Sequence, residues 1–521
     1  MKQTRKRSRN LSEISKFKLS INLGLVIVFL AGCSSGNSPA NAPAASTPAT
    51  SDKPLEIQMT VRLFDQVPDM NNSYWVEYQK RTNTKLNVEW IPDGDYATKL
   101  NLILASNNLP EVLIANPSNN VNSPPFINAV KNGAFWDLTP FLGDFSKYPN
   151  LKNNVAPNAW VTGKTLGKIY GIPQSVSTVQ GSPNIRKDLL DQLGIPMPQT
   201  LDEYSSALKK IIAANPGMIG MVSKQDVFLN SSGGLSNAFG TDKPTYNPEG
   251  GLIYSKLTPQ FTEFVAWMKT LFADGILSKE FSVMKPTQAT ELYQSGKAAS
   301  LINESMRWSY PFTQTLKKIK PDAEAQSVAP LKGPGGYAVG VGTGVVDQMF
   351  IAKTVPEAKV KQILDYFEKT TTLDYYNLTT YGVEGTHYNV VNGYKVITPL
   401  RDKELGSSAP WQVLPLFYNK YMKMDSTAAP EEYNLAQEKL FESWGYFDKG
   451  MVDPFAVATS TTWVANWPKY QQEWASMAIK AVVGQISMED YKAYVDKLNN
   501  NPEIKKAYLE FAQSYKDVYG K

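Results

Sequence analysis

Cysteine and histidine, which supply disulfides, most zinc ligands and the base of a serine triad, are scarce in this chain. Among its 521 residues there is one cysteine, Cys33, and one histidine, His387. A single cysteine excludes an internal disulfide and a cysteine-based zinc site. A single histidine excludes multi-histidine metal motifs such as H-E-x-x-H. A Ser-His-Asp triad would have to use His387, because the chain has no second histidine.

Cys33 lies at the end of a segment typical of a secretory signal peptide. Seven basic residues and one acidic residue, Glu13, precede an apolar run from Ile21 to Leu30. A basic start, a short apolar run and small residues at the cut site form the signal-peptide pattern. The run is short for a membrane span, and no later stretch approaches one. Residues 1–32 are therefore predicted to be a signal peptide.

Leu30-Ala-Gly-Cys33 resembles the bacterial lipobox. The resemblance implies cleavage before Cys33 and lipidation of its thiol, which would anchor the protein at the extracellular face of the cytoplasmic membrane. An ordinary signal peptide with an incidental cysteine is the alternative. The tract that follows, SSGNSPANAPAASTPATS at 34–51, is uncharged and lacks large apolar residues. It cannot bury enough surface to offset its ordering entropy, so residues 33–53 are predicted to be a lipidated cysteine and a flexible linker.

The signal peptide also explains the net charge of the chain. The full sequence carries 53 Lys and Arg against 48 Asp and Glu, a net charge of +5. Seven of the basic residues and one of the acidic residues lie within residues 1–32, which leaves 46 against 47. The exported chain is therefore close to neutral, and its composition gives no argument for nucleic acid as a partner.

The first folded segment alternates strands and helices. Strands are predicted at 55–63, 85–91 and 111–115, with helices between them at 74–81 and 95–106. This order predicts an α/β fold with a parallel sheet covered by helices. Ligands bind such sheets at the carboxyl ends of the strands. Here those ends are the loops Phe64–Ser73 and Ile91–Asp95.

Helices dominate the remainder of the chain. Thr200-Leu-Asp-Glu203 fits a capping box, with Thr200 as the N-cap of a helix that runs to about Ala214. A turn at 167–173 leads into a strand, and a short helix is predicted from Ile185. Further amphipathic helices are predicted over the ranges 261–275, 287–297, 356–370, 469–483 and from 487 onward.

Several segments, in the same order and spacing, resemble the extracellular solute-binding proteins of bacterial ABC importers, family 1. Within that family the chain is similar to the long, LplA-like lipoprotein branch, from about residue 55 to the C-terminus. The segments that carry the resemblance are LNLILASNNLPE (100–111), GKIYGIP (167–173), IRKDLLDQLGIPMPQTLDEY (185–204), YQSGKAAS (293–300) and YGVEGTHY (381–388).

The resemblance implies a two-lobed, type II periplasmic-binding-protein-like fold with a hinge between the lobes. The first lobe would hold residues 54–174 and 345–395, and the second residues 175–344 and 396–521. Gly340-Val-Gly-Thr-Gly344 would lie at the return crossing between them. That run does not fit G-x-G-x-x-G, and no acidic ribose partner follows it at a suitable spacing, so a turn or flexible crossing is favoured over a dinucleotide loop.

The family usually binds sugars, and the aromatic content agrees with this independently. A sugar ring stacks its C–H face on a flat aromatic side chain, and the chain has 11 Trp. The candidate stacking residues are Trp75, Trp308 and Trp411. Packing beneath the first helix is at least as good an explanation for Trp75. Trp463, Trp467 and Trp444 are predicted to be core residues.

Polar side chains are expected around the rim of the sugar, where they bond its hydroxyls. Gln174 directly follows the hinge-side Pro173, and Asn303, Glu304 and Arg307 flank Trp308. Glu304 and Arg307 have the alternative of pairing with each other. Asp95 is a weaker candidate, because it lies at a helix start where N-capping is the favoured role.

The expected function is that of a membrane-anchored binding protein, not an enzyme. It would capture a carbohydrate, in particular an oligosaccharide, between two lobes and deliver it to ABC permease subunits, acting as a monomer without a cofactor. A cell-surface carbohydrate-active enzyme with two carboxylates, or an adhesin or sensory accessory lipoprotein, is the alternative.

Many long relatives carry a calcium loop after the helix that begins at Thr200. Here the corresponding stretch, 213–221, lacks the acidic ligands, so we expect no metal there.

Overall fold

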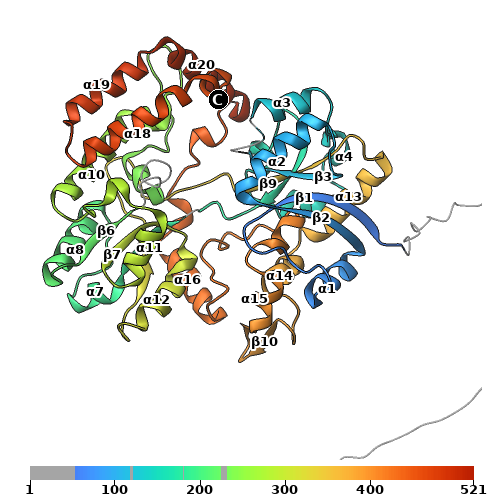
Figure 1. The fold of residues 1–521 in the computed structure, drawn as a ribbon, viewed down its shortest axis with the longest axis horizontal. Coiled ribbons are helices and arrows are strands. Elements are labelled where there is room, and N and C mark those ends of the chain that lie inside the picture. The colour runs from blue at the N-terminus through green and yellow to red at the C-terminus, as the bar shows by residue number, and fades with distance from the viewer. Residues whose placement is uncertain (1–52, 118–120, 122, 180, 224–231, 521) are drawn as a thin grey trace, which may run out of the picture. The chain divides into compact units, whose positions relative to one another are not determined.

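The computed structural model describes residues 53–521, apart from 118–120, 122, 180, 224–231 and 521. The predicted signal peptide, Cys33 and nearly all of the predicted linker lie outside the described residues. Within the described part of the chain, no helix is both long and apolar enough to cross a membrane. The described residues form two α/β halves, and each half consists of one sheet with the helices packed on it (Figure 1). Each half is called a layer below.

The first sheet has the strand order β2-β1-β3-β9-β4. β1 (Leu55–Leu63) pairs in parallel with β2 (Thr84–Pro92) and with β3 (Val112–Ala115), as the alternating sequence predicts. The later strand β9 (Val345–Ile351) enters antiparallel between β3 and β4 (Gly171–Ser175). Helices α1 (Ser73–Thr82), α2 (Asp93–Ser106) and α13 (Glu357–Thr370) lie close to this sheet (Figure 1). The α/β fold with a largely parallel first sheet is confirmed.

The second sheet has the order β6-β7-β5-β8. β6 (Ile219–Val222) pairs in parallel with β7 (Ala298–Glu304), while β5 (Ser182–Arg186) pairs antiparallel with β7 and with β8 (Ala325–Ser327). A helix was predicted to begin at Ile185, but Ile185 is a fully buried residue of strand β5. The helix, α7, begins two residues later and spans Lys187–Gln192. A hydrophobic cluster joins this sheet to α8 (Leu201–Ala214), α10 (Pro259–Ala273) and the three C-terminal helices α18 (Pro468–Val482), α19 (Met488–Asn499) and α20 (Pro502–Tyr519).

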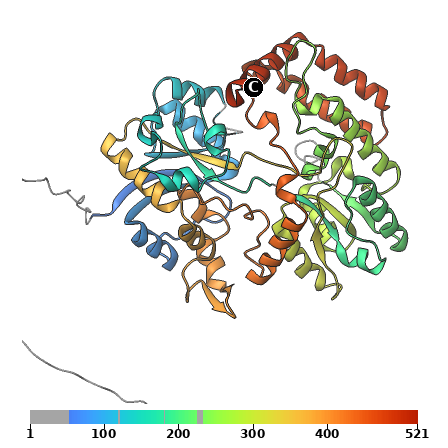
Figure 2. The same cartoon turned by 180° about the vertical axis from the view of Figure 1, so that it is seen from behind.

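Figure 2 shows from behind that different helices pack around each of the two sheets. Further elements complete the two layers. They are α3 (Pro124–Lys131), α4 (Thr139–Leu142), α5 (Pro149–Asn153), α6 (Ala159–Thr162), α11 (Pro286–Gln294), α12 (Ser309–Lys317), α14 (Leu373–Tyr381), β10 (Tyr388–Val391), β11 (Tyr394–Ile397), α15 (Pro399–Leu405), α16 (Glu431–Ser443), α17 (Thr461–Asn466) and the 3-10 turns η5 (Met306–Trp308) and η6 (Ala409–Val413).

Segments that connect the two sheets run beside one another. Val341, between β8 and β9, pairs with Val179, between β4 and β5, and also with Val452 from the C-terminal part. Gly344 has a φ of +78°, and a Cβ there would lie 2.4 Å from the Cβ of Ala156. A side chain at this position would therefore be both strained and blocked, so glycine is required where the chain returns to the first sheet.

The segment after β11 packs on the first sheet. Leu405, Val413, Leu414 and Met422 belong to the same hydrophobic cluster as β1 and α1. The backbone N–H of Ser175, at the end of β4, donates to Pro415 at 2.9 Å. This segment lies within residues 396–521, which the resemblance assigns to the second lobe, and it packs on the first sheet.

Helix α8 illustrates how local sequence fixes an element boundary. The Thr200 hydroxyl oxygen accepts from the backbone N–H of Glu203 at 3.1 Å, as predicted for an N-cap. The Glu203 carboxylate accepts instead from Gln199 at 2.7 Å, one residue earlier than the reciprocal bond of a capping box. We expect Thr200→Ala to lower the free energy of unfolding by about 1 kcal/mol, since one helical N–H loses its partner. Urea denaturation measures this, and Thr200→Ser, which keeps the hydroxyl, should cost much less. Equal losses for the two variants would contradict the capping role.

Candidate functional site

A cavity of about 1160 Å³ lies among loops from both sheets. The first sheet contributes the loop that follows β1 and the residues around the end of β4. The second sheet contributes the turn after β7, and the long segment 401–428 supplies much of the remaining wall. The predicted ligand loop Phe64–Ser73 thus lines the cavity, whereas the other predicted loop, Ile91–Asp95, does not.

Four of the residues singled out from the sequence meet in this cavity, whereas Trp75 and Asp95 do not line it. Those that line it are Gln174, Arg307, Trp308 and Trp411. Asp95 lies away from it, exposed in the first turn of α2. The side chains of Asn303 and Glu304 fall outside the described residues, as does Cys33.

Trp75 belongs to the core and does not reach the cavity. Its side chain is 0% exposed, in the hydrophobic cluster of the first sheet. Its ring meets those of Tyr74, Tyr78 and Trp90 edge to face at centroid distances of 5.1, 5.7 and 5.9 Å. The alternative weighed from the sequence, packing beneath the first helix, is the one that the structure shows.

The side chain of Gln174 is held by two hydrogen bonds, and its oxygen forms none. The side-chain N–H groups donate to the backbone oxygens of Trp411 at 3.0 Å and Leu414 at 2.8 Å. The side chain is 1% exposed, and its oxygen has no hydrogen-bond partner within the described chain. The oxygen of Gln412, 6% exposed and also on the cavity wall, is in the same state. Buried polar atoms are nearly always paired, so these two oxygens on the cavity wall need a donor, which an ordered water or a ligand hydroxyl would supply.

Two tryptophan rings lie on the wall, one from each layer. Trp411 is half-buried in η6 and packs against the core of the first sheet. Trp308 ends η5 beside the second sheet and is 41% exposed. Its ring stacks on that of Phe312 at 6.2 Å, and the Arg307 guanidinium lies 5.6 Å from its centre. The cavity therefore offers aromatic surface from both sides.

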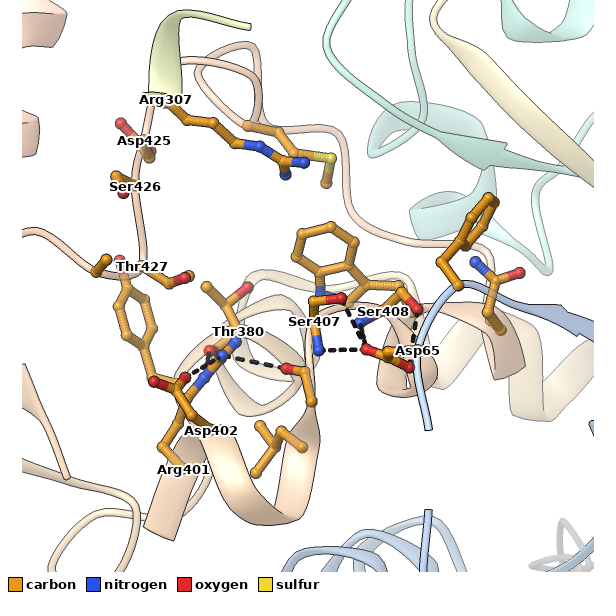
Figure 3. Close-up of a pocket in the computed structure, with 18 of the residues that line it drawn as sticks. Asp65, Arg307, Thr380, Arg401, Asp402, Ser407, Ser408, Asp425, Ser426 and Thr427 are labelled. Atoms are coloured by element: carbon orange, nitrogen blue, oxygen red, sulfur yellow. Dashed lines mark hydrogen bonds and ion pairs between the residues drawn. The ribbon is translucent and has the colours of Figure 1, made fainter. Parts of the chain in front are cut away.

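Asp65, from the loop after β1, fixes part of segment 401–428. Its carboxylate accepts from the backbone N–H and hydroxyl of Ser407 at 2.6 and 2.7 Å. It also accepts from the N–H of Ser408 at 3.2 Å, and Figure 3 shows these bonds on the cavity wall. Gly406 just before has a φ of +62°, and a Cβ there would lie 2.9 Å from this carboxylate. The serine hydroxyls are thereby held in place at the cavity.

We expect Asp65→Ala to weaken ligand binding by about tenfold or more, because the donors of Ser407 and Ser408 lose their shared acceptor. Titration calorimetry with a bound solute measures the change. Asp65→Asn keeps one acceptor oxygen and should lose less. Unchanged affinity in Asp65→Ala would contradict a positioning role for this carboxylate.

The adjoining helix α15 is tied down by Arg401. Its guanidinium donates to the Thr380 backbone oxygen at 2.9 Å, to the Asp402 carboxylate at 2.8 Å and to the Gly406 oxygen at 3.2 Å (Figure 3). Arg401 is buried, so these bonds offset the loss of water from its charge. The sequence analysis singled out no residue of this helix. Its start at Pro399 and its end at Gly406 were the available signals.

The single histidine is structural. His387 is fully buried, and its Nδ1 accepts from the backbone N–H of Val383 at 3.0 Å. Its Nε2 lies 3.1 Å from the Glu404 carboxylate, to which the Ser73 hydroxyl also donates at 2.6 Å. In a catalytic triad the acid holds Nδ1 and the serine donates to the imidazole. Here the serine donates to the acid, so no nucleophile is activated. Burial raises the pKa of Glu404, but the bonds from Ser73 and His387 bring that pKa below its usual value.

A pair of carboxyl groups lies at the cavity edge but lacks the geometry of a glycosidase. Burial, followed by the neighbouring Glu438, raises the pKa of Asp425 well above its usual value. Glu438 does not line the cavity, so only one of the two carboxyl groups faces the space that a ligand would occupy. Glycosidase carboxyls flank the scissile bond about 5–9.5 Å apart. Among the described residues, no group of three or more His, Cys, Asp or Glu side chains is placed to hold a metal ion.

Comparison with known proteins settles the family. Residues 68–371 match the family described as bacterial extracellular solute-binding protein, which is more than half of the chain. The chain belongs to this family of solute-binding proteins. The predicted membership is thus confirmed, and with it the expectation that the chain is a binding protein and not an enzyme.

This solute-binding protein is similar to several individual relatives in sequence and in fold. It is 28% identical over 386 residues to the polygalacturonan/rhamnogalacturonan-binding protein YtcQ of Bacillus subtilis, covering 71% of this chain and 74% of the relative. It is 25% identical over 388 residues to lipoprotein LipO of the same organism, covering 71% and 73%. Its fold matches the HMO-binding, ABC-transporter-associated solute-binding protein of Bifidobacterium longum infantis with a TM-score of 0.63 at 15% identity, over 90% of this chain and 99% of that one. The two-lobed periplasmic-binding-protein fold is therefore confirmed.

Proposed function

We propose that this solute-binding protein captures an oligosaccharide in the cavity and delivers it to an ABC permease. The observation that carries the proposal is the pair of buried, unpartnered oxygens of Gln174 and Gln412 on a wall that also presents Trp411. Sugar hydroxyls supply donors for such oxygens, and the C–H face of the ring packs on an indole. Trp308 adds a second aromatic surface from the other layer.

The size of the cavity and the relatives support an oligosaccharide. Its volume of about 1160 Å³ exceeds the roughly 300–1,000 Å³ of sites for drug-sized ligands. The relative YtcQ is named for binding polygalacturonan and rhamnogalacturonan, which are polymers of sugars. A chain of several sugar units suits both observations.

Delivery requires that ligand binding change the shape of the protein. We propose a first lobe of residues 54–174 and 345–422 and a second lobe of residues 175–344 and 423–521, which revises the boundary expected from the sequence so that it follows the packing. The ligand stabilises a closed form because it contacts both lobes, and the paired crossing segments around Val179, Val341 and Val452 act as the hinge. The permease then recognises the closed form.

The anchor is proposed to be a lipid on Cys33. We expect mass spectrometry of the mature chain to find Cys33 at the N-terminus carrying diacylglycerol. Cys33→Ser should accumulate as an uncleaved precursor without lipid, because lipidation precedes cleavage at a lipobox. A wild-type mature chain that starts elsewhere and bears no lipid would instead support the ordinary signal peptide.

A melting-temperature screen tests the proposed function. The chain from position 33 onward, expressed without the signal peptide and with Cys33→Ser, is called the processed chain below. It is heated with a panel of neutral and acidic oligosaccharides and with amino acids and peptides as non-sugar controls. A ligand that binds the native state raises the midpoint, by an amount that grows with its concentration. We expect one or more oligosaccharides to do so. A response confined to the non-sugar controls would contradict the proposal.

A further inference from the structure

Two positively charged side chains meet in the cavity, and neither has an acidic partner within the part of the chain that the structure describes. Arg307 and Lys423 both line it, and the backbone N–H of Arg307 donates to the Lys423 oxygen at 3.0 Å, so the two residues are neighbours. Both side chains are half-buried. Among the described residues, neither forms an ion pair, and Figure 3 shows Arg307 reaching into the cavity from the side opposite Thr380 and Arg401.

The carboxylates of the cavity are occupied elsewhere. Asp65 accepts from Ser407 and Ser408, and Asp402 pairs with Arg401 at 2.8 Å. Glu404 is bonded by Ser73 and His387. Burial, followed by the neighbouring Glu438, raises the pKa of Asp425 to about 8, which favours its uncharged form. Asp69 accepts from the nearby backbone N–H of Asn71 and is exposed. Within the described part of the chain, none of these acidic groups forms an ion pair with Arg307 or Lys423.

The arrangement is costly for the protein alone. Burial and the adjacent Arg307 lower the pKa of Lys423 to about 8, and burial also lowers the pKa of Arg307. Two like charges held side by side and partly out of water disfavour their charged forms. An anionic group placed between them would reverse both effects, and such perturbed pairs in a cavity mark functional sites.

We infer that the carbohydrate bound here is acidic, and that Arg307 and Lys423 bind its carboxylate. The inference rests on the proposed function and adds the charge of the sugar to it. A planar carboxylate matches the two parallel N–H donors of a guanidinium, while Lys423 adds a point charge. Trp308, beside Arg307, offers its exposed ring to the same sugar unit. The class of ligand is therefore a uronic-acid-containing oligosaccharide.

Matched pairs of ligands test the charge directly. Calorimetry compares tri-galacturonate with its fully methyl-esterified form, and an alginate trisaccharide with its esterified form, against the processed chain carrying Cys33→Ser. We expect at least one acid to bind and its ester, which has the same ring but no charge, to bind at least tenfold more weakly. Raising the salt concentration should weaken the binding of the acid and leave the binding of the ester unchanged.

Substitutions connect the effect to the two cations. Arg307→Gln and Lys423→Gln should each weaken binding of the acid by about 10- to 100-fold, because a charge-assisted hydrogen bond is lost. Lys480→Gln, an exposed lysine of α18 outside the cavity, is the control and should change nothing. Melting temperatures without ligand verify that each variant is folded.

The outcomes separate this inference from the proposed function. Binding of neutral oligosaccharides alone, equal affinity for an acid and its ester, or unchanged acid binding in Arg307→Gln and Lys423→Gln would overturn the inference and leave the proposed function standing. A protein that responds to no sugar of the wider screen, but to a non-sugar control, would overturn both.

Discussion

Replacing Trp75 by alanine is expected to lower the free energy of unfolding by about 3–5 kcal/mol, among the largest effects of a core truncation. The indole is 0% exposed and is surrounded by the rings of Tyr74, Tyr78 and Trp90. Its N–H has no partner within the described chain, so the loss comes from packing and from the cavity left behind. Urea or guanidinium denaturation at constant pH measures the difference.

A second substitution separates packing from ligand contact at this position. Trp75→Phe keeps an aromatic ring in the cluster and should lose clearly less stability than Trp75→Ala. Because Trp75 does not line the cavity, neither variant should change the affinity of the folded protein for its sugar. A weakened affinity in the fully folded Trp75→Phe protein would contradict the structural role assigned here.

Trp308→Ala is expected to weaken sugar binding by about 2 kcal/mol, or roughly 30-fold, while leaving stability nearly unchanged. The ring is 41% exposed, so its removal uncovers little core, yet it lines the cavity beside Arg307. A stacking aromatic contributes large apolar area with few rotatable bonds, which makes its loss costly for binding. Calorimetry with the sugar identified by the screen measures the affinity.

Trp267→Ala provides the opposite control for Trp308→Ala. Trp267 is half-buried on α10, packs against the core of the second sheet and does not line the cavity. Its truncation should lower stability and leave affinity unchanged. If Trp308→Ala behaved in the same way as Trp267→Ala, the stacking role of Trp308 would be contradicted.

Local sequence patterns were sufficient for the elements of the first sheet. Alternating apolar residues predicted β1 within its observed bounds, and strand–helix alternation predicted its parallel neighbours. The insertion of β9 between β3 and β4 depends on pairing between segments that are 170 or more residues apart along the chain. No local periodicity carries that information. The resemblance to a family, not the pattern of residues, indicated two lobes.

The site shows the same division between local and distant information. Trp308 and Gln174 were found because they follow recognisable segments, and both line the cavity. Trp75 was proposed because it starts the first helix beside the predicted ligand loop, although Tyr74, Trp75 and Tyr78 share the helical spacing of a core stripe. Of segment 401–428 only Trp411 was predicted. The rest of the segment joins the site through bonds to residues far away in sequence, such as Asp65 to Ser407 and Gln174 to Leu414.

The packing of segment 401–428 also explains how the cavity can couple to motion. Pro415 is bonded to Ser175 at the end of β4, while Lys423 is bonded to Arg307 after β7. One short segment therefore touches both layers next to the ligand. A ligand held by Arg307, Lys423 and Gln174 at once would draw these layers together.

Small-angle X-ray scattering of the processed chain, with and without saturating sugar, tests the central claim most directly. The claim is that a carbohydrate binds between two lobes and stabilises a closed form. It predicts a smaller radius of gyration and a shorter maximum dimension when the sugar is bound. For the control, the sugar concentration is chosen to saturate the unsubstituted protein but to stay below the dissociation constant of the Trp308→Ala variant. At that concentration the scattering of the variant should not change. A sugar that saturates the protein, as shown by calorimetry on the same sample, and leaves the scattering curve unchanged would contradict it.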